Sequence, residues 1–177
     1  MSGPVADALF AYGSLVWRPG FEPVSRARAS LAGRARRFWQ ASHDHRGTPA
    51  APGRVLTLVP MPGEACEGVV LGLPPEGRDA LLAALDERER DGYARALVRP
   101  ALADGRTVTA VTWIAVEGNP SWVGPDPDVA ALIASRAGPS GSNADYLFEV
   151  VRSLGAAGVR DPYLEALARE VRSMAAG

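Results

Sequence analysis

The order of the apolar segments constrains the fold of this chain more than any other feature of its sequence. As far as Val116 these segments are short and are separated by turns rich in Gly and Pro, which is typical of strands. One helix-like segment interrupts them, between Pro74 and Gly92. From Asp128 onward the pattern is helical. Strands with one inserted helix, followed by helices, predict an α+β domain without internal repeats.

These segments place the individual elements. We expect strands at residues 8–12, 27–42, 55–59, 66–73, 94–102 and 107–116. The turns at residues 60–63 and 103–106 predict two hairpins. Proline opens the inserted helix at Pro74-Pro75 and Gly92 ends it, while the last helices are expected at residues 129–137, 142–154 and 163–174. A sheet of this size is large enough to curl into a barrel.

The length and composition of the chain favour one domain, residues 1–177, and its net charge excludes two classes of partner. A net charge of -1 and a pI near 6.1 give no bulk attraction for nucleic acid or anionic lipid, so we expect neither as a partner. No apolar run approaches the roughly 18 residues of a membrane span, and the first residues lack the pattern of a signal peptide. Cys66 is the only cysteine, which agrees with a reducing cytoplasm. Its strand-like neighbours favour a buried or edge thiol over a nucleophile.

The segment from Leu81 to Tyr93 carries its apolar stripe directly into a cluster of charges. Leu81, Leu85 and Glu89 are four residues apart, so they share one face of a helix that reaches its last turn. Burial on that face and the negative end of the helix dipole both raise a carboxyl pKa, as a general base requires. The alternative is a solvated helix end whose charges, at residues 86–90, pair with one another. Spacing alone favours the second interpretation without excluding the first.

The first expected strand ends at Gly13-Ser14, which indicates a tight turn. Gly13 lets a ligand come close to the backbone, and the Ser14 hydroxyl lies beside exposed N–H groups, so the turn has the parts of an anion-binding nest. Most turns of this composition are only turns. In isolation this motif therefore favours a structural role.

Both histidines lie in a polar loop, residues 42–54. His43, Asp44 and His45 are residue types that bind metals, but they need further ligands from elsewhere, and the sequence has no matching His or Cys cluster. We therefore expect no metal site. The loop is interpreted as one whose charged groups pair with one another or line a polar pocket.

Several spaced blocks form a pattern far more specific than any one of them. They are YGSLVW at residues 12–17 with PGF at 19–21, RRFWQ at 36–40, DHRGTP at 44–49, PGRV at 52–55, DERE at 86–89 with GY at 92–93, AGPSG at 137–141 and YLF at 146–148. In this order, over nearly the whole chain, they closely resemble the ChaC family of glutathione-specific γ-glutamylcyclotransferases. The chain departs from that pattern at Ala11 and Asp91, where glycine is common, and at His43, where threonine is usual. Asp91 matters most, because a second carboxylate near Glu89 would raise the pKa of the pair or alter the loop that admits substrate.

The resemblance implies a γ-glutamylcyclotransferase-like fold, a small mixed β-barrel with packed helices. It implies an enzyme that cleaves the γ-glutamyl bond of glutathione to 5-oxoproline and cysteinylglycine without a cofactor. The catalytic acid/base of the family falls on Glu89. The substrate-binding turn of the family falls on Ala11, Tyr12, Gly13, Ser14, Leu15 and Val16.

The implied reaction defines what the residues have to do. The α-amine of the substrate attacks its own γ-carbonyl, so a base has to take a proton from an amine with a reference pKa near 8, and the departing amide nitrogen has to receive one. One carboxyl group, Glu89, can do both if it lies between them. N–H groups of the Gly13-Ser14-Leu15 turn suit the oxyanion or a substrate carboxylate.

Three further residues are candidates for substrate binding. The Tyr146 hydroxyl is suited to orienting the substrate, unless the ring merely packs. Arg46 and Arg54 are suited to the glycine carboxylate, unless they bridge the loop to Asp44.

Two other functions stay open at this point. The chain is expected to act on glutathione, but the same fold and base also suit other γ-glutamyl peptides or γ-glutamyl amines. A non-catalytic module that only binds a metabolite is the alternative from a different class.

Overall fold

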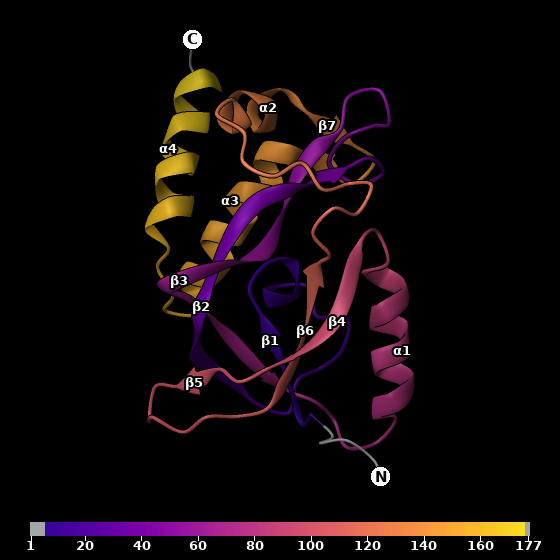
Figure 1. The fold of residues 1–177 in the computed structure, drawn as a ribbon, viewed down its shortest axis with the longest axis vertical. Helices are drawn as coiled ribbons and strands as arrows, with labels where there is room; N and C mark the ends of the chain where they lie inside the picture. The colour runs from indigo at the N-terminus through magenta and orange to yellow at the C-terminus, as the bar shows by residue number, and fades with distance from the viewer. Residues whose placement is uncertain (1–5, 176–177) are drawn as a thin grey trace.

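The computed structural model describes residues 6–175 as a mixed sheet flanked by helices (Figure 1). The strands of the main sheet are β1 (Ala8–Ala11), β2 (Arg26–Ser42), β3 (Gly53–Gly72), β4 (Tyr93–Val98), β5 (Ala101–Leu102) and β6 (Ala110–Ala115). The helices are the 3₁₀ turn η1 (Ser14–Val16), α1 (Arg78–Arg88), α2 (Val129–Ser135), α3 (Asn143–Ala156) and α4 (Pro162–Ala175). A small hairpin, β7 (Ala137–Gly138) and β8 (Gly141–Ser142), joins α2 to α3. The α+β class is therefore confirmed.

The sheet is open, so the expected barrel is wrong. Its strand order is β4-β6-β1-β3-β2-β5, and within residues 6–175 no pairing joins the two end strands. A sheet closes into a barrel only when each strand pairs with the next at a consistent shift in register, all the way round. Here β2 and β3, of 17 and 20 residues, continue far beyond β1, which has four. Figure 1 shows this long ribbon leaving the short strands and running toward α2.

The hairpin expected at residues 55–59 and 66–73 is also wrong. Both segments belong to the continuous strand β3, because β2 is long enough to pair with both. The register between the two strands shifts between Ala32 and Arg34, where Gly33 has a φ of +73°. The residues at 60–63 therefore form a largely exposed irregularity in a long ribbon instead of a chain reversal.

The second expected strand pair is found as antiparallel β4 and β6, although β5 leaves that pair to bond with β2 at the opposite end of the strand order. The three C-terminal helices are confirmed. They pack against one another, and Leu147, Leu154, Leu164 and Val171 are almost fully buried between them and the sheet. No helix within residues 6–175 is long and apolar enough to cross a membrane.

The largest fully buried side chain carries a charge. Arg36, on β2, is 1% exposed. Its Nη1 donates a hydrogen bond of 2.7 Å to the carbonyl oxygen of Tyr12, and its Nε lies 2.9 Å from Oδ2 of Asp161. A buried guanidinium is tolerated when it is paired in this way. Arg36 therefore ties β2 to the end of β1 and to the start of α4.

Replacing this buried cation tests how far the fold depends on it. We expect Arg36→Met to lower the free energy of unfolding by about 3–5 kcal/mol, because Asp161 then loses its buried partner. Chemical denaturation of both proteins measures the difference. Adding Asp161→Asn should recover part of the loss, since it removes the unpaired carboxylate.

The matched control is Arg160→Gln, which breaks an exposed pair with Glu165. That variant should unfold close to the wild-type midpoint. Equal effects of Arg36→Met and Arg160→Gln would contradict the structural role of Arg36.

Candidate active site

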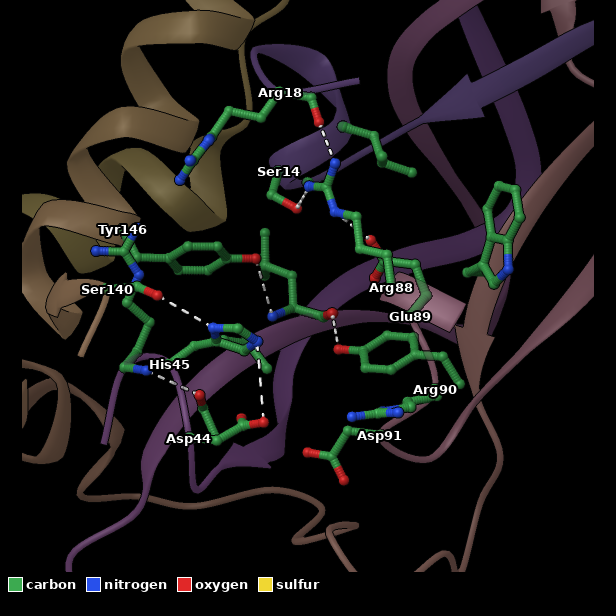
Figure 2. Close-up of a pocket in the computed structure, with 18 of the residues that line it drawn as sticks. Ser14, Arg18, Asp44, His45, Arg88, Glu89, Arg90, Asp91, Ser140 and Tyr146 are labelled. Carbon is green, nitrogen blue, oxygen red and sulfur yellow. Dashed lines mark hydrogen bonds and ion pairs between the residues drawn. The ribbon is translucent and has the colours of Figure 1, made fainter. Parts of the chain in front are cut away.

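A cavity of about 660 Å³ opens where the end of β1, the β2–β3 connection, the end of α1 and the start of α3 meet (Figure 2). Its volume lies in the range of small-molecule sites. The residues that line it are Tyr12, Gly13, Ser14, Leu15, Trp17, Arg18, Ala41, Ser42, Asp44, His45, Arg46, Val55, Leu56, Glu87, Arg88, Glu89, Arg90, Asp91, Tyr93, Trp113, Ser140 and Tyr146.

Glu89 lines this cavity at the end of α1. The helix stays regular to Arg88, and Glu89 is its C-cap, with its N–H donating to the Leu85 carbonyl at 2.9 Å. The Glu89 side chain is 18% exposed. Burial raises the pKa of its carboxyl above the ordinary value, against smaller opposing effects of Arg88 and then His45. Glu89 thus has the shelter that a general base needs.

The neighbouring charges follow the alternative interpretation, that of a solvated helix end. Glu87 and Arg90 pair with each other in the exposed outer turn. Asp86 accepts from Arg95 and from the indole N–H of Trp113. A solvated ion pair between Glu87 and Arg90 and a sheltered carboxyl at Glu89 therefore lie in the same turn.

Asp91 does not form a carboxylate pair with Glu89. Its carboxylate accepts from the hydroxyl of Ser121 at 3.1 Å, and its carbonyl accepts from the side chain of Gln40 at 2.8 Å. The groups that lower the pKa of Glu89 are Arg88 and His45. Asp91 instead anchors the turn between α1 and β4, which Gly92 completes with a φ of +79°.

The turn after β1 faces the same cavity. Gly13, Ser14 and Leu15 all line it, and their N–H groups precede the first hydrogen bonds of η1, which begin at the N–H of Val16. Ala11 and Val16 were predicted with them. They are 0% and 6% exposed and pack in the core, so the structure does not bring them to the cavity surface.

Two buried tyrosines, Tyr12 and Tyr146, and the partly buried Tyr93 surround Glu89, and their hydroxyls differ. Tyr12 donates to the carbonyl of Trp113 at 2.7 Å, and Tyr93 donates to the carbonyl of Leu56 at 2.6 Å. The Tyr146 hydroxyl accepts from the Leu56 N–H at 3.5 Å, and within residues 6–175 its own proton has no acceptor. Burial raises the pKa of Tyr146 to about 12, so the hydroxyl stays protonated at neutral pH.

The ring of Tyr146 also packs, while its hydroxyl oxygen lies at the cavity. It contacts Trp17 and Phe38 with ring centroids 6.0 Å apart in each case. An oxygen that faces the cavity on a ring held by two aromatic neighbours is a well-oriented donor.

The two candidate arginines lie in different places. Arg46 lines the cavity, donates to the Ser142 carbonyl at 3.2 Å and lies 5.5 Å above the Tyr146 ring. Burial lowers the pKa of the Arg46 guanidinium. Arg54 lies 3.3 Å from the carboxylate of Asp126 and does not line the cavity. Neither forms the expected bridge to Asp44.

The polar loop forms part of the cavity mouth. Nδ1 of His45 lies 3.0 Å from the Ser140 hydroxyl, and Nε2 lies 3.9 Å from Asp44 Oδ2 (Figure 2). The loop and the β7–β8 hairpin pack so closely that a Cβ on Gly138 would lie 2.4 Å from the His45 carbonyl oxygen. Among residues 6–175 no three His, Cys, Asp or Glu side chains are grouped to hold a metal.

Cys66 lies on β3, away from the cavity, and is 3% exposed. Burial raises the pKa of its thiol, which favours the unreactive protonated form. The predicted buried strand thiol is confirmed.

Sequence reasoning missed several lining residues. Arg88 and Tyr93 were within recognisable blocks, but no spacing rule separates a cavity-lining residue from its neighbours in such a block. Leu56 and Trp113 reach the cavity only through pairings between distant strands. Those pairings were the least predictable part of the fold.

Comparison with known proteins identifies the family of this chain. The family model described as ChaC-like protein matches residues 8–174. Gamma-glutamylcyclotransferase 2-3 of Arabidopsis thaliana is 36% identical, over 93% of this chain and 87% of the relative. Glutathione-specific gamma-glutamylcyclotransferase 1 of Homo sapiens is 34% identical, over 97% and 81%.

A crystal structure of a glutathione-specific γ-glutamyl cyclotransferase from yeast superposes with a TM-score of 0.87 at 31% identity, covering 94% of this chain and 95% of the yeast chain. The family match spans nearly all of the described residues, and the similarity in fold extends over the same range. The chain therefore belongs to the ChaC-like protein family.

Proposed function

We propose that this protein is a γ-glutamylcyclotransferase that converts glutathione to 5-oxoproline and cysteinylglycine, with Glu89 as the general acid/base. The observation that carries the proposal is the sheltered Glu89 carboxyl, which lines one cavity with Gly13, Ser14 and Tyr146. Relatives named as glutathione-specific enzymes support the choice of substrate. A module that only binds a metabolite has no use for a carboxyl group whose burial disfavours its charged form.

The reaction needs one group that both accepts and donates a proton. Glu89 takes a proton from the α-ammonium, and the freed amine attacks the γ-carbonyl carbon to close the lactam ring. As the bond to cysteine breaks, Glu89 gives that proton to the departing nitrogen. Glu89 then accepts one of the two protons on the ring nitrogen, which leaves the lactam N–H in place, and passes it to the released amine. The ammonium of cysteinylglycine replaces that of glutathione, so atoms and charges balance and no cofactor is required.

The turn and the tyrosine bind the polar groups of the substrate in this proposal. N–H groups of Gly13, Ser14 and Leu15 stabilise the oxyanion or hold the α-carboxylate, because they are preorganised donors at the cavity wall. The uncommitted proton of Tyr146 orients the γ-glutamyl group. Holding the bent conformer matters because a well-placed internal nucleophile needs little further assistance.

Arg46 is our candidate for the glycine carboxylate, since it lies beside the cavity mouth formed by His45 and Ser140. We assign Arg54 to support of the loop through Asp126. Ala11 and Val16 support the turn from the core. The proposed enzyme is a cytoplasmic protein of one domain, residues 1–177, that acts on a small molecule without nucleic acid or membrane partners.

Replacing the proposed base tests the function directly. We expect Glu89→Gln to lower kcat for 5-oxoproline formation from glutathione by roughly 10²–10⁴-fold, or about 3 kcal/mol or more in barrier height, because the amide cannot accept the ammonium proton. Glutathione affinity, measured by calorimetry, should change little. Glu170→Gln on the exposed face of α4 is the matched control and should retain wild-type turnover.

Wild-type turnover of γ-glutamyl-alanine and γ-glutamyl-lysine, measured beside glutathione, separates the substrate classes. Faster turnover of either would assign the enzyme to other γ-glutamyl compounds. Full activity of Glu89→Gln would remove Glu89 from the mechanism.

The raised pKa of Glu89 predicts the pH profile. The productive state pairs the Glu89 carboxylate with the substrate ammonium, so kcat/KM should rise as pH increases through the pKa of Glu89 and fall as the amine, of reference pKa near 8, loses its proton. Because burial raises the pKa of Glu89, the acidic limb should lie above the ordinary glutamate value of 4.5. An acidic limb at or below that value would show that the base is solvated.

A further inference from the structure

Arg88 connects the proposed base to the substrate-binding turn. Its Nε lies 3.2 Å from Oε1 of Glu89. On the other side of the same guanidinium, Nη1 donates to the carbonyl oxygen of Arg18 at 2.5 Å, and Nη2 donates to the hydroxyl of Ser14 at 3.4 Å. Figure 2 shows Arg88 between Glu89 and the turn that carries Ser14 and Arg18.

The contact leaves the two oxygens of Glu89 in different situations. Oε1 pairs with Arg88, whereas within residues 6–175 no hydrogen bond reaches Oε2. A carboxylate held through one oxygen keeps a fixed plane, and its other oxygen remains available for proton transfer. A planar guanidinium suits this role because its rigid fork of donors can hold groups on two sides at once.

An ordinary surface pair on the same turn provides a comparison. Arg90 and Glu87 form an ion pair in which both side chains are more than 70% exposed. In contrast, Arg88 is 35% exposed and reaches a segment about seventy positions earlier in the chain, with two separate contacts there. This arrangement has the geometry of a brace across the cavity.

We propose that Arg88 is a positioning residue, which fixes the separation between Glu89 and the Ser14 turn and directs Oε2 of Glu89 toward a substrate amine held at that turn. This inference rests on the proposed function. It adds a residue that acts through the base and through the turn, and that does not itself exchange protons with the substrate.

The charge of Arg88 also acts on the titration of Glu89. The ionisable groups that face Glu89 are Arg88 from α1, His45 from the β2–β3 connection, Tyr12 directly after β1, Tyr93 from β4 and Tyr146 from α3. The tyrosines are neutral at neutral pH, and burial raises their pKa values. Arg88 lowers the pKa of Glu89 more than His45 does, and it is the permanent cation of the set.

Two substitutions separate the effect of the positive charge of Arg88 from the effect of its several guanidinium donors. We expect Arg88→Gln to lower kcat/KM for glutathione by roughly 10–100-fold, because a misplaced base loses near-attack geometry. It should also move the acidic limb of the pH profile upward. Arg88→Lys should keep the limb near its wild-type position and still lower kcat, because one ammonium cannot hold both segments. Arg152→Gln, which breaks an exposed pair with Glu149, is the matched control and should match wild type in both measurements.

A titration without substrate keeps this test independent of the proposed function. Carbon-13 NMR of carboxyl-labelled glutamate, with the Glu89 signal identified by its loss in Glu89→Gln, gives the pKa of Glu89 in wild type and Arg88→Gln. A higher pKa of Glu89 in Arg88→Gln supports the proposed role of Arg88. An unchanged pKa of Glu89 together with wild-type kinetics overturns it. If wild-type protein does not consume glutathione, the proposed function fails, while the titration still decides whether Arg88 acts on Glu89.

Circular dichroism establishes that each variant is folded. If Arg88→Gln does not fold, Arg88→Lys carries the test through kcat. Wild-type kcat in Arg88→Lys would then contradict the need for a guanidinium that holds two segments at once.

Discussion

The site depends on one carboxyl group held where water is scarce. Glu89 is the C-cap of α1, and α1 ends against the cavity instead of in solvent because Leu82 and Leu85 anchor the preceding turns in the core. Gly92 then reverses the chain into β4, where the Tyr93 hydroxyl donates to the Leu56 carbonyl at the cavity wall. The shelter of Glu89 is thus a product of tertiary packing, and its raised pKa follows from that packing.

The opposite wall is held by a second set of buried polar contacts. Arg36 fixes the carbonyl of Tyr12, the Tyr12 hydroxyl is bonded to β6 at Trp113, and the next residue begins the Gly13 turn. Each contact satisfies a buried group that is costly to leave unpaired. Together they keep the turn in place from behind, while Arg88 reaches it across the cavity. Apolar packing therefore positions one wall of the cavity, and buried polar contacts position the other.

The sequence predicted the local features of this protein better than its long-range pairings. A helical stripe ending in a carboxylate and a glycine after a buried strand are local signatures, and they drew attention to Glu89 and the Gly13-Ser14 turn. In isolation both patterns favoured a structural interpretation, and the functional roles came from the resemblance to the ChaC family. The hairpin at residues 60–63 was wrong because Pro and Gly mark irregular backbone, whether or not the chain reverses there. The barrel was wrong because β2 and β3 extend far beyond β1. Arg54 was placed by its motif alone, and nothing in that motif indicated its pairing with Asp126.

The central claim is that the sheltered Glu89 lies within reach of the α-amine of a bent γ-glutamyl substrate. A crystal structure of Glu89→Gln with glutathione bound measures this most directly. The account predicts the γ-glutamyl group against the Gly13-Ser14 turn, with its α-nitrogen about 3 Å from the side chain at position 89. Glutathione bound with its α-nitrogen directed to solvent, or held outside this cavity, would contradict it.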